Sequence, residues 1–525
     1  MHIPGLKKEL TLVDLTFASV GGIIGSGWIL ASQTATQIAG PAAIISWLIG
    51  GCAILLLGLV YAELGAMMPE AGAAVRYPQY SHGSFVSFIM AWAGYLTWAL
   101  VSPAEAEAIT QLANVYWKGL YNTQTSLLTP LGLLVSAILI FVFYVINYYG
   151  VRWFAVSNTA LTWFKFILPL ATALIFIFGA HNFSNITSQG FAPYGFSKVF
   201  IAIGTSGIVF SFLGFRQAIE LAGEARNPSR DVPRAVILSI LIGIVVYAAL
   251  QMAFVIGVPA ADAAKGWANL SFSNPWVKVA VTLNIGWLVL LLKIDGWLSP
   301  GGTGLVYTAS TGRSVFAMAE NRYVPAWLGK LNKTGVPANA MLLNMIVGII
   351  ALFPSQGWSH IIGVISLTGV FSYLMGPVAA SVFRRTAPDL KRPVFMKSMS
   401  VLAPVAFVLA GMVVYWSGWT TNSLGLIVIV LGLVIYAYYY NKNKFSGEDI
   451  RRGMWLVVYI AAILLISYLG DKNFGGIGVI AFPYDNIAVA AVSLICFYWG
   501  VASGTETKEL AELKAEIAAE PIAKA

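Results

Sequence analysis

Charged residues are scarce in this sequence. Asp, Glu, Lys and Arg make up 10% of the 525 residues, whereas 58% of the residues are hydrophobic. In a typical soluble domain about a quarter of the residues are charged. The mean hydropathy is +0.78. This composition excludes an ordinary water-soluble core and predicts a protein that is embedded in a lipid bilayer.

Cysteine and histidine are also rare. The two cysteines, Cys52 and Cys496, both lie in apolar runs, and there are four histidines in all. A disulfide framework and a clustered metal site are therefore not expected. The sequence also lacks a phosphate-binding glycine loop and a Gly-x-Ser-x-Gly nucleophile motif. We expect no catalytic residue, no metal, no cofactor and no use of ATP.

Long apolar runs recur along the whole chain. A run of about 17 to 25 apolar residues can cross a hydrocarbon core of about 30 Å as a helix. The hydropathy pattern predicts twelve spans near residues 12–38, 42–68, 84–113, 129–149, 153–179, 198–222, 232–257, 275–310, 338–354, 359–383, 399–417 and 421–440, and two more near 453–470 and 485–503. The predicted fold class is an all-α polytopic membrane protein.

These spans divide the chain into five predicted parts. They are an N-terminal segment (1–11), a core of ten spans (12–383), spans eleven and twelve (399–440), two extra spans (453–503) and a short amphipathic tail (504–525). The parts are predicted to belong to one multi-pass protein of the cell membrane, plasma or inner.

The net charge of +9 arises mainly in the loops. Most Lys and Arg residues lie on the same side as the N-terminus, and those of the opposite side are Lys118, Lys198, Lys265, Lys278 and Lys472. By the positive-inside rule both termini are predicted to be cytoplasmic. A charge spread over membrane loops gives no reason to expect a nucleic-acid partner.

Two predicted spans are interrupted by small residues. The first contains Gly21, Gly22, Gly25, Ser26 and Gly27, and the sixth contains Gly204, Thr205, Ser206, Gly207, Ser211 and Gly214. Close helix packing would explain either cluster alone. Together they have the spacing of an inverted five-plus-five repeat, in which two broken helices hold the substrate near the midplane.

A broken membrane helix leaves backbone groups that a ligand can satisfy. A carboxylate can accept hydrogen bonds from the N–H groups that follow Gly25, and an ammonium group can donate to carbonyls around Phe210 to Gly214. An amino acid zwitterion carries both groups. The pattern therefore predicts an amino acid as substrate.

The sequence resembles the amino acid-polyamine-organocation (APC) permeases over roughly residues 8–440. The resemblance rests on Gly25–Trp28, the run Tyr-Ala-Glu-Leu-Gly-Ala-Met-Met-Pro-Glu-Ala-Gly at 61–72, Phe210–Phe215, Gly223–Pro228, Asp231–Ala235, and the segment from Gly312-Arg313 to Pro325. It implies a LeuT-type fold with discontinuous first and sixth helices, twelve core helices and alternating access. Two extra C-terminal helices and the run Val75–Tyr80 resemble the aspartate-proton symporter branch.

The helix breaks and the resemblance together predict a substrate site, made of Ile23, Gly25, Ser26, Gly27, Phe210, Ser211, Phe212, Gly214 and Arg216. Phe210 resembles the aromatic gate position of the family. Arg216 stands where many relatives carry glutamate. Facing the cavity, its guanidinium would favour a substrate with a side-chain carboxylate. Facing the cytoplasmic gate, it would pair with Glu220 or with another gate acid, and both interpretations stay open.

Lys165 and Asp295 are predicted to take part in proton coupling. A charged ammonium group in mid-span costs roughly 3 kcal/mol on insertion scales. In proton-coupled permeases that the chain resembles, a lysine at this place occupies the position of a sodium ion, although a permanently paired structural lysine is an alternative. Around Asp295, the residues Gly296 to Gly301 predict an irregular stretch that turns its carboxylate to the cavity, and a structural ion pair is the alternative.

Three other acidic residues are expected in solvent or in a gate or loop contact. Glu105 and Glu107, near Pro103, are expected in a solvated position at the outer mouth, and Glu63 in a gate or loop contact. His82 has a weak claim to be a pH sensor, since loop histidines usually are not.

Taken together, the sequence predicts a proton-coupled symporter for an acidic or small neutral amino acid. An amino acid exchanger is the alternative, and Lys165 favours the symporter because an exchanger needs no titrating group there. A non-transporting nutrient receptor on the same scaffold is a remote third. Amino acid, protons and lipid are the expected partners, and nothing in the sequence predicts the oligomeric state.

Overall fold

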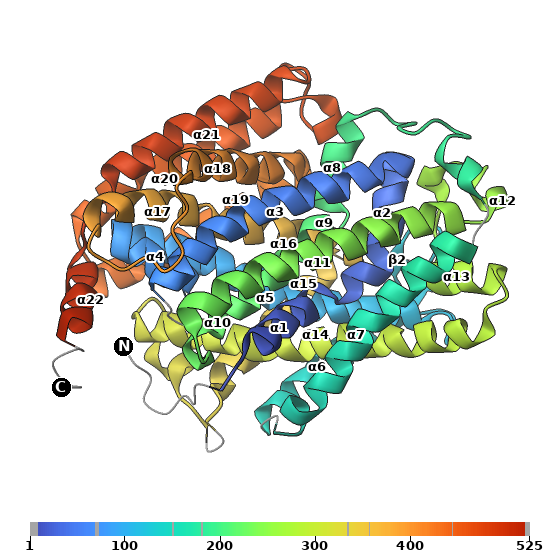
Figure 1. Cartoon of the computed structure of the whole chain (residues 1–525), viewed down its shortest axis with the longest axis horizontal. Coiled ribbons are helices and arrows are strands. Elements are labelled where there is room, and N and C mark those ends of the chain that lie inside the picture. Colours follow the sequence, from blue (N-terminus) through green and yellow to red (C-terminus); the bar gives the residue numbers. More distant parts are fainter. Residues whose placement is uncertain are drawn as a thin grey trace.

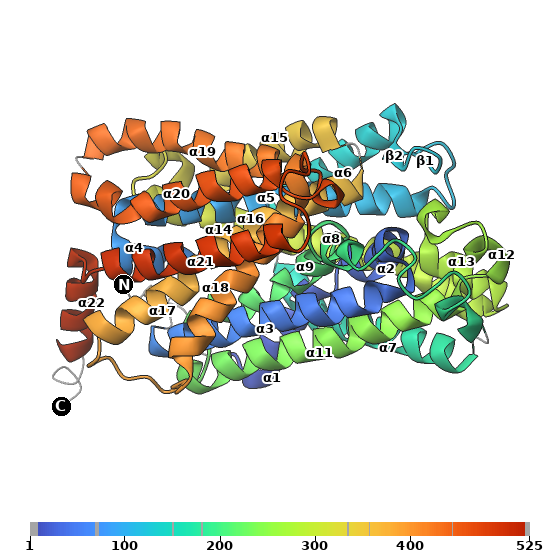
Figure 2. The same ribbon diagram turned by 90° about the horizontal axis from the view of Figure 1, so that it is seen from above.

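The computed structural model of the chain describes residues 9–68, 73–149, 152–179, 182–332, 335–355, 357–443 and 445–519. These residues are mostly helical, and the long helices run roughly parallel to the long axis of the molecule (Figures 1 and 2). The hairpin of β1 (Tyr121–Asn122) and β2 (Leu127–Leu128) forms a two-stranded antiparallel sheet. An all-helical interior satisfies backbone groups that lipid cannot.

The first half of the chain forms α1 (Leu12–Ile23), α2 (Ser26–Ala39), α3 (Ala43–Met67), α4 (Ala73–His82), α5 (Ser84–Ala113), α6 (Pro130–Tyr148), α7 (Arg152–Gly179), α8 (Ser197–Thr205), α9 (Ile208–Phe212), α10 (Gln217–Glu220) and α11 (Pro228–Gly257). The second half forms α12 (Ala260–Ala263), α13 (Pro275–Thr282), α14 (Gly286–Glu320), α15 (Ala338–Ser355), α16 (Trp358–Tyr373), α17 (Met375–Thr386), α18 (Met399–Trp416), α19 (Gly418–Asn443), α20 (Gly447–Leu469), α21 (Tyr484–Ser503) and α22 (Lys508–Ala519).

Membrane-spanning helices recur along the described chain, as predicted. Nine helical segments of the described residues are long and apolar enough to cross a bilayer, and a tenth results if the bent pair α8 and α9–α10 is one span. Shorter apolar helices lie at Leu12–Ile23, Trp163–Gly179 and Ala338–Phe353, inside three further predicted spans. The polytopic membrane class is confirmed, whereas the exact number of spans, the five domain boundaries and the inverted repeat stay predictions.

Both predicted helix interruptions are present in the structure. Helix α1 ends at Ile23 and α2 begins at Ser26, and α8 ends at Thr205 before α9 begins at Ile208. The second break bends the chain by 52°. It contains Gly207 with a φ of +94°, a left-handed conformation that glycine adopts without a steric penalty.

Two local expectations are wrong in the region 275–310. The predicted span there begins with a separate short helix, α13, and α14 follows as one helix of 35 residues. Helix α14 continues through Pro300, so the irregular stretch expected after Asp295 does not form. A membrane helix tolerates proline where neighbouring helices pack around it, because the single lost hydrogen bond can be replaced locally.

The centre of the molecule contains α5 and α16, whose residues are largely buried. The peripheral helices α6, α19 and α21 instead expose large apolar side chains, among them Phe141, Leu431 and Ile495. A wide apolar exterior around a packed interior is the surface that a lipid-embedded protein presents.

The first and last described residues of the chain lie at the same end of the molecule. Leu10, just before α1, forms a parallel bridge with Ala225, close to the start of α11. Helix α22 packs near α4 at the left-hand end of Figure 1, and α12 and α13 lie at the right-hand end. The predicted tail is helical over Lys508–Ala519, whereas residues 1–8 and 520–525 of the predicted terminal segments lie outside the described residues.

Candidate functional site

The start of α2 carries a buried carboxylate, that of Glu105 from α5. The Ser26 N–H donates to Glu105 at 3.1 Å from Oε2 and 3.4 Å from Oε1. Gly25 allows this approach, since a Cβ there would lie 2.7 Å from Oε1 of Glu105. A carboxylate is stabilised at a helix N-terminus by the unpaired N–H groups. The expected solvated position was wrong, because Glu105 and Glu107 are both fully buried.

Lys165 approaches the same break from α7. Its Nζ donates to the Gly21 carbonyl in the last turn of α1 at 3.0 Å, and to Thr303 Oγ1 of α14 at 2.9 Å. A cation at the end of α1 and an anion at the start of α2 each match the local helix dipole. The break is therefore stabilised by two opposite charges from different helices.

Asp295 anchors α2 through the indole of Trp28. Its Oδ2 accepts a hydrogen bond from Trp28 Nε1 at 2.9 Å, and its Oδ1 accepts one from Ser299 Oγ at 2.6 Å. Trp276 Nε1 in turn donates to the Trp28 carbonyl at 2.9 Å. The irregular stretch expected after Asp295 is absent, and the ammonium group of its neighbour Lys293 lies against the ring of Tyr116.

The second break packs directly against the first. A Cβ on Gly214 would lie 2.2 Å from the carbonyl carbon of Gly22 and the nitrogen of Ile23. Ser19 Oγ joins the same two segments, because it donates to the Phe215 carbonyl at 3.2 Å and accepts from the Ala218 N–H at 3.0 Å. The two broken helices, distant in sequence, thus form one site.

Ser26, Gly27, Phe210 and Ser211 lie together across the two breaks. A Cβ on Gly27 would meet the Ser211 hydroxyl, and Trp358 of α16 donates from Nε1 to Ser26 Oγ at 2.8 Å. The ring of Phe210 lies edge-on to Trp358, with 6.3 Å between ring centroids. An aromatic pair therefore covers the start of α2.

The two remaining predicted site residues with apolar side chains, Ile23 and Phe212, lie at the edge of this cluster. Tyr247 of α11 donates its hydroxyl to the Ile23 carbonyl at 2.7 Å. Phe212 points away, because its ring packs edge-on against Trp47 and Tyr247. Ile23 thus contributes backbone to the break, whereas Phe212 contributes packing.

Arg216 forms an ion pair with Glu220, as the gate interpretation predicts, and its guanidinium has one further donor group. Its Nη2 lies 2.8 Å from Glu220 Oε1, and Nε donates to the same atom at 3.2 Å. The guanidinium carbon lies 4.5 Å from the ring centroid of Trp98 and 5.2 Å from that of Tyr373. Nη1 is buried and has no hydrogen-bond partner, and an unmet buried donor favours an additional acceptor.

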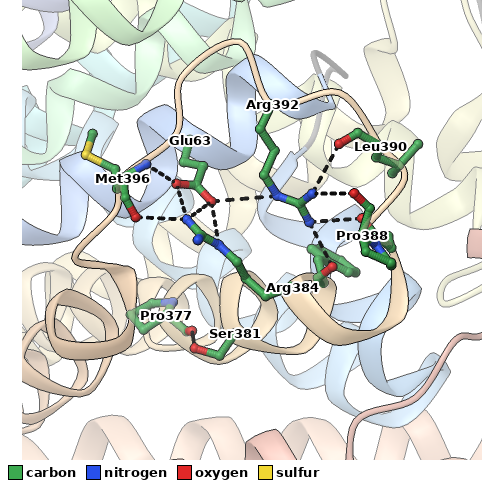
Figure 3. Close-up of polar contacts among 10 residues, drawn as sticks. Glu63, Pro377, Ser381, Arg384, Pro388, Leu390, Arg392 and Met396 are labelled. Atoms are coloured by element: carbon green, nitrogen blue, oxygen red, sulfur yellow. Dashed lines mark hydrogen bonds and ion pairs between the residues drawn. The ribbon is translucent and has the colours of Figure 1, made fainter.

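Glu63 links α3 to the end of α17, as Figure 3 shows. Its carboxylate receives Arg384 Nη2 at 2.7 Å and the Met396 N–H at 2.7 Å. Arg392 lies 3.9 Å away and donates to the carbonyl of Phe383 in the last turn of α17 and to that of Ala387, which follows the helix. The expected gate or loop contact is therefore present. The motif containing Glu63 continues over 69–72, outside the described residues.

We expect Glu63→Gln to lower the free energy of unfolding by roughly 2 to 3 kcal/mol, because it leaves the partly buried guanidinium of Arg384 without its counter-ion. Equilibrium unfolding of the detergent-solubilised protein by SDS measures this change. Glu448→Gln is the matched control, since Glu448 is 60% exposed and lies 3.9 Å from Arg451. Equal effects of the two substitutions would contradict a structural role for the Glu63 cluster.

His82 joins α4 to the C-terminal segment. Its Nε2 lies 2.8 Å from the Gly500 carbonyl and its Nδ1 lies 2.9 Å from Ser81 Oγ. Burial lowers the pKa of His82 to about 4, against the weaker opposing effect of the Gly500 hydrogen bond, and Arg452 and Arg385 lower it further. The imidazole is therefore neutral at physiological pH.

The low pKa predicts acid sensitivity of this contact. Its stabilisation is complete above pH 6.5, where free histidine is neutral, and is lost as the pH falls toward 4. We expect the hydrogen-exchange protection factor of the Thr505 amide, which donates to Ser81, to fall over that window. His82→Gln should remove the dependence, and an unchanged profile in that variant would contradict the assignment.

Sequence reasoning missed Glu105, Thr303 and Trp358 as members of this site. Glu105 carried a usable signal, because a carboxylate within a predicted span is a functional candidate by the same argument as Lys165. Thr303 and Trp358 carried none, since both residue types are common in membrane helices. Among the described residues there is no group of three or more metal-ligating side chains.

These features define a polytopic membrane protein whose two broken helices meet at a buried, charged site, and comparisons with known proteins give its family. The amino acid permease family model matches residues 10–464. The chain is 42% identical over 521 residues to the glutamate/serine transporter AimA of Bacillus subtilis (strain 168), covering 97% of this chain and 96% of that protein. It is 35% identical over 506 residues to the aspartate-proton symporter of the same organism, covering 95% and 97%.

A more distant relative, the branched-chain amino acid permease BcaP of Bacillus subtilis, is 25% identical over 466 residues and is covered to 94%. The chain belongs to the amino acid permease family, within the APC superfamily, and it is an amino acid transporter and not an enzyme. The family resemblance inferred from the motifs is thereby confirmed.

Proposed function

We propose that this protein is a proton-coupled symporter for an acidic amino acid, working by alternating access on a LeuT-type inverted repeat in the cell membrane with cytoplasmic termini. The observation that carries the proposal is the placement of Lys165 and Glu105 on the two sides of the α1–α2 break. Two relatives named for glutamate/serine transport and aspartate-proton symport agree with it.

The substrate carboxylate and Glu105 require the same donor. The N–H groups at the start of α2 are the expected ligands of the substrate carboxylate, and Ser26 N–H is held by Glu105 in this structure. Binding of substrate thus requires Glu105 to give up that hydrogen bond. A proton on Glu105 releases it, because a neutral carboxyl group gains little from the helix dipole.

Charge balance then gives one proton per molecule of acidic amino acid. At the α1–α2 break the ammonium group of Lys165 and the carboxylate of Glu105 balance each other. Aspartate or glutamate has two carboxylates and one ammonium group, so it adds a net charge of −1 to a low-dielectric interior, where an unpaired charge costs several kcal/mol. Protonation of Glu105 restores the balance, so proton and substrate enter together.

Arg216 supports the acidic substrate. Its buried Nη1 has no hydrogen-bond partner, and a guanidinium binds a carboxylate by charge-assisted hydrogen bonds. In this proposal the side-chain carboxylate of the substrate accepts from Nη1, while Glu220 keeps Nη2. Aspartate and glutamate are therefore preferred over neutral amino acids, and cationic amino acids are repelled.

Uptake of labelled aspartate into proteoliposomes tests the proposal. We expect an imposed inward proton gradient to raise initial uptake at least about tenfold. A tenfold difference in proton concentration supplies about 1.4 kcal/mol per proton, which corresponds to a factor of ten. Glutamate should compete strongly, whereas leucine and arginine should not. Uptake that ignores the gradient and requires an internal amino acid would identify an exchanger instead.

A further inference from the structure

Lys293 places an ammonium group on the outward face of α14. Its neighbours Leu290, Ile294 and Trp297 are 60%, 43% and 44% exposed, as expected of side chains that face lipid. Nζ lies 5.3 Å from the ring centroid of Tyr116. Among the described residues no ion pair joins Lys293 to a carboxylate.

An ammonium group in this setting needs an anionic partner. Lys293 lies seven residues inside α14, which begins at Gly286, and this separation is about 10 Å along a helix. A charge at such depth is costly in hydrocarbon unless its side chain reaches the interface or meets a counter-ion. The cation–π contact with Tyr116 provides only part of that stabilisation.

An apolar groove adjoins this ammonium group. It has a volume of about 340 Å³ and lies between the ends of α5 and α6 and the outward face of α14. Its lining includes Ile109, Ala113, Tyr116, Leu120, Val135 and Trp297. Tyr116 belongs both to the groove and to the Lys293 contact, and Trp297 follows Lys293 by one helical turn, so the ammonium group and the groove are contiguous.

The order of the ammonium group and the apolar groove along the helices matches the order of headgroup and acyl chain in a phospholipid. Helix α14 starts at the end of the molecule that carries α13, so Lys293 lies nearer that end than Trp297. Helix α5 finishes at the same end, where Tyr116 and Trp117 follow it and are 52% and 56% exposed, as interfacial aromatic residues are. The cation thus lies nearer this end of the molecule than the part of the groove that is lined by Ile109 and Trp297.

We propose that this groove binds one anionic phospholipid of the adjoining leaflet, with an acyl chain in the groove and the headgroup phosphate at Lys293 Nζ. A zwitterionic headgroup would bring its own cation close to Lys293, which favours a lipid of net negative charge. Attraction of an anionic lipid by one lysine near the surface gives about a fivefold preference. This site lies on the periphery and is independent of the substrate site.

Lipid retention by the full-length protein tests this proposal. The purified protein is equilibrated with equal amounts of phosphatidylglycerol and phosphatidylcholine, washed with detergent and examined by native mass spectrometry. We expect about fivefold more phosphatidylglycerol than phosphatidylcholine in the last retained lipid. Lys293→Gln should reduce this ratio to about one, whereas Lys278→Gln should keep it, since Lys278 lies at the same end and is 46% exposed.

A second measurement needs no charge-changing variant. Phosphatidylglycerol with a brominated chain should quench the emission of Trp297 more than brominated phosphatidylcholine does, measured as the difference between the wild-type protein and Trp297→Phe. Equal retention of the two lipids by the wild type, or an unchanged ratio in Lys293→Gln, would overturn the proposal. Equal quenching by the two lipids would do the same.

Discussion

Lys165→Ala is expected to reduce proton-driven aspartate uptake by at least about 100-fold. The substitution leaves Glu105 as a buried carboxylate without its cation and removes the donor to the Gly21 carbonyl at the end of α1. Leaving a buried charge uncompensated costs about 3 to 5 kcal/mol, which corresponds to more than two decades in a rate or population. Uptake into proteoliposomes under an inward proton gradient measures the loss.

The matched controls separate proton coupling from folding. Lys278→Ala removes an exposed lysine and should transport normally. Glu105→Gln keeps the size of the side chain but cannot titrate, so amino acid exchange should persist while stimulation by the gradient disappears. The double variant Lys165→Ala/Glu105→Gln removes both charges and should recover exchange but not coupling. A gradient response in any of the three site variants would refute the coupling role.

Arg216→Gln should change which amino acids are transported. We expect aspartate uptake to fall about 10- to 100-fold, the effect of losing a hydrogen bond to a charged group worth about 1.5 to 3 kcal/mol. Any uptake of serine, used as a neutral comparison, should change less than about threefold. Initial rates of both substrates, measured side by side, give the ratio. Arg313→Gln, which removes an exposed arginine of α14, should leave it unchanged.

The ion pair with Glu220 offers a further control for this prediction. Arg216→Gln/Glu220→Gln removes both charges of the pair seen in the structure. If Arg216 binds the side-chain carboxylate of the substrate, the double variant should still lose aspartate uptake selectively. A parallel loss of aspartate and serine in both variants would instead place Arg216 at the cytoplasmic gate.

Much of the fold could be predicted because lipid makes each span locally recognisable. A segment in hydrocarbon must satisfy its backbone by itself, so apolar length predicts a helix without knowledge of its neighbours. The predicted span 84–113 coincides with α5. Glycine clusters likewise marked the breaks at Gly25 and Gly207, since backbone conformation there depends on the residue itself.

Helix regularity around Pro300 could not be predicted in the same way. The sequence from Gly296 to Gly301 contains residues that weaken a helix, yet α14 continues through them. Packing against neighbouring helices decides such a case, because a helix that is confined on several sides has little freedom to unwind.

The sequence by itself determined that this protein is a membrane-embedded amino acid permease with two interrupted helices and a lysine, Lys165, within an apolar segment. Only the tertiary structure decided the partners of these groups. Glu105 meets Ser26 across 79 positions, Lys165 meets Thr303 across 138, and Asp295 meets Trp28 across 267. Such pairings depend on which faces of distant helices come together, and helix periodicity specifies a face without specifying its neighbour.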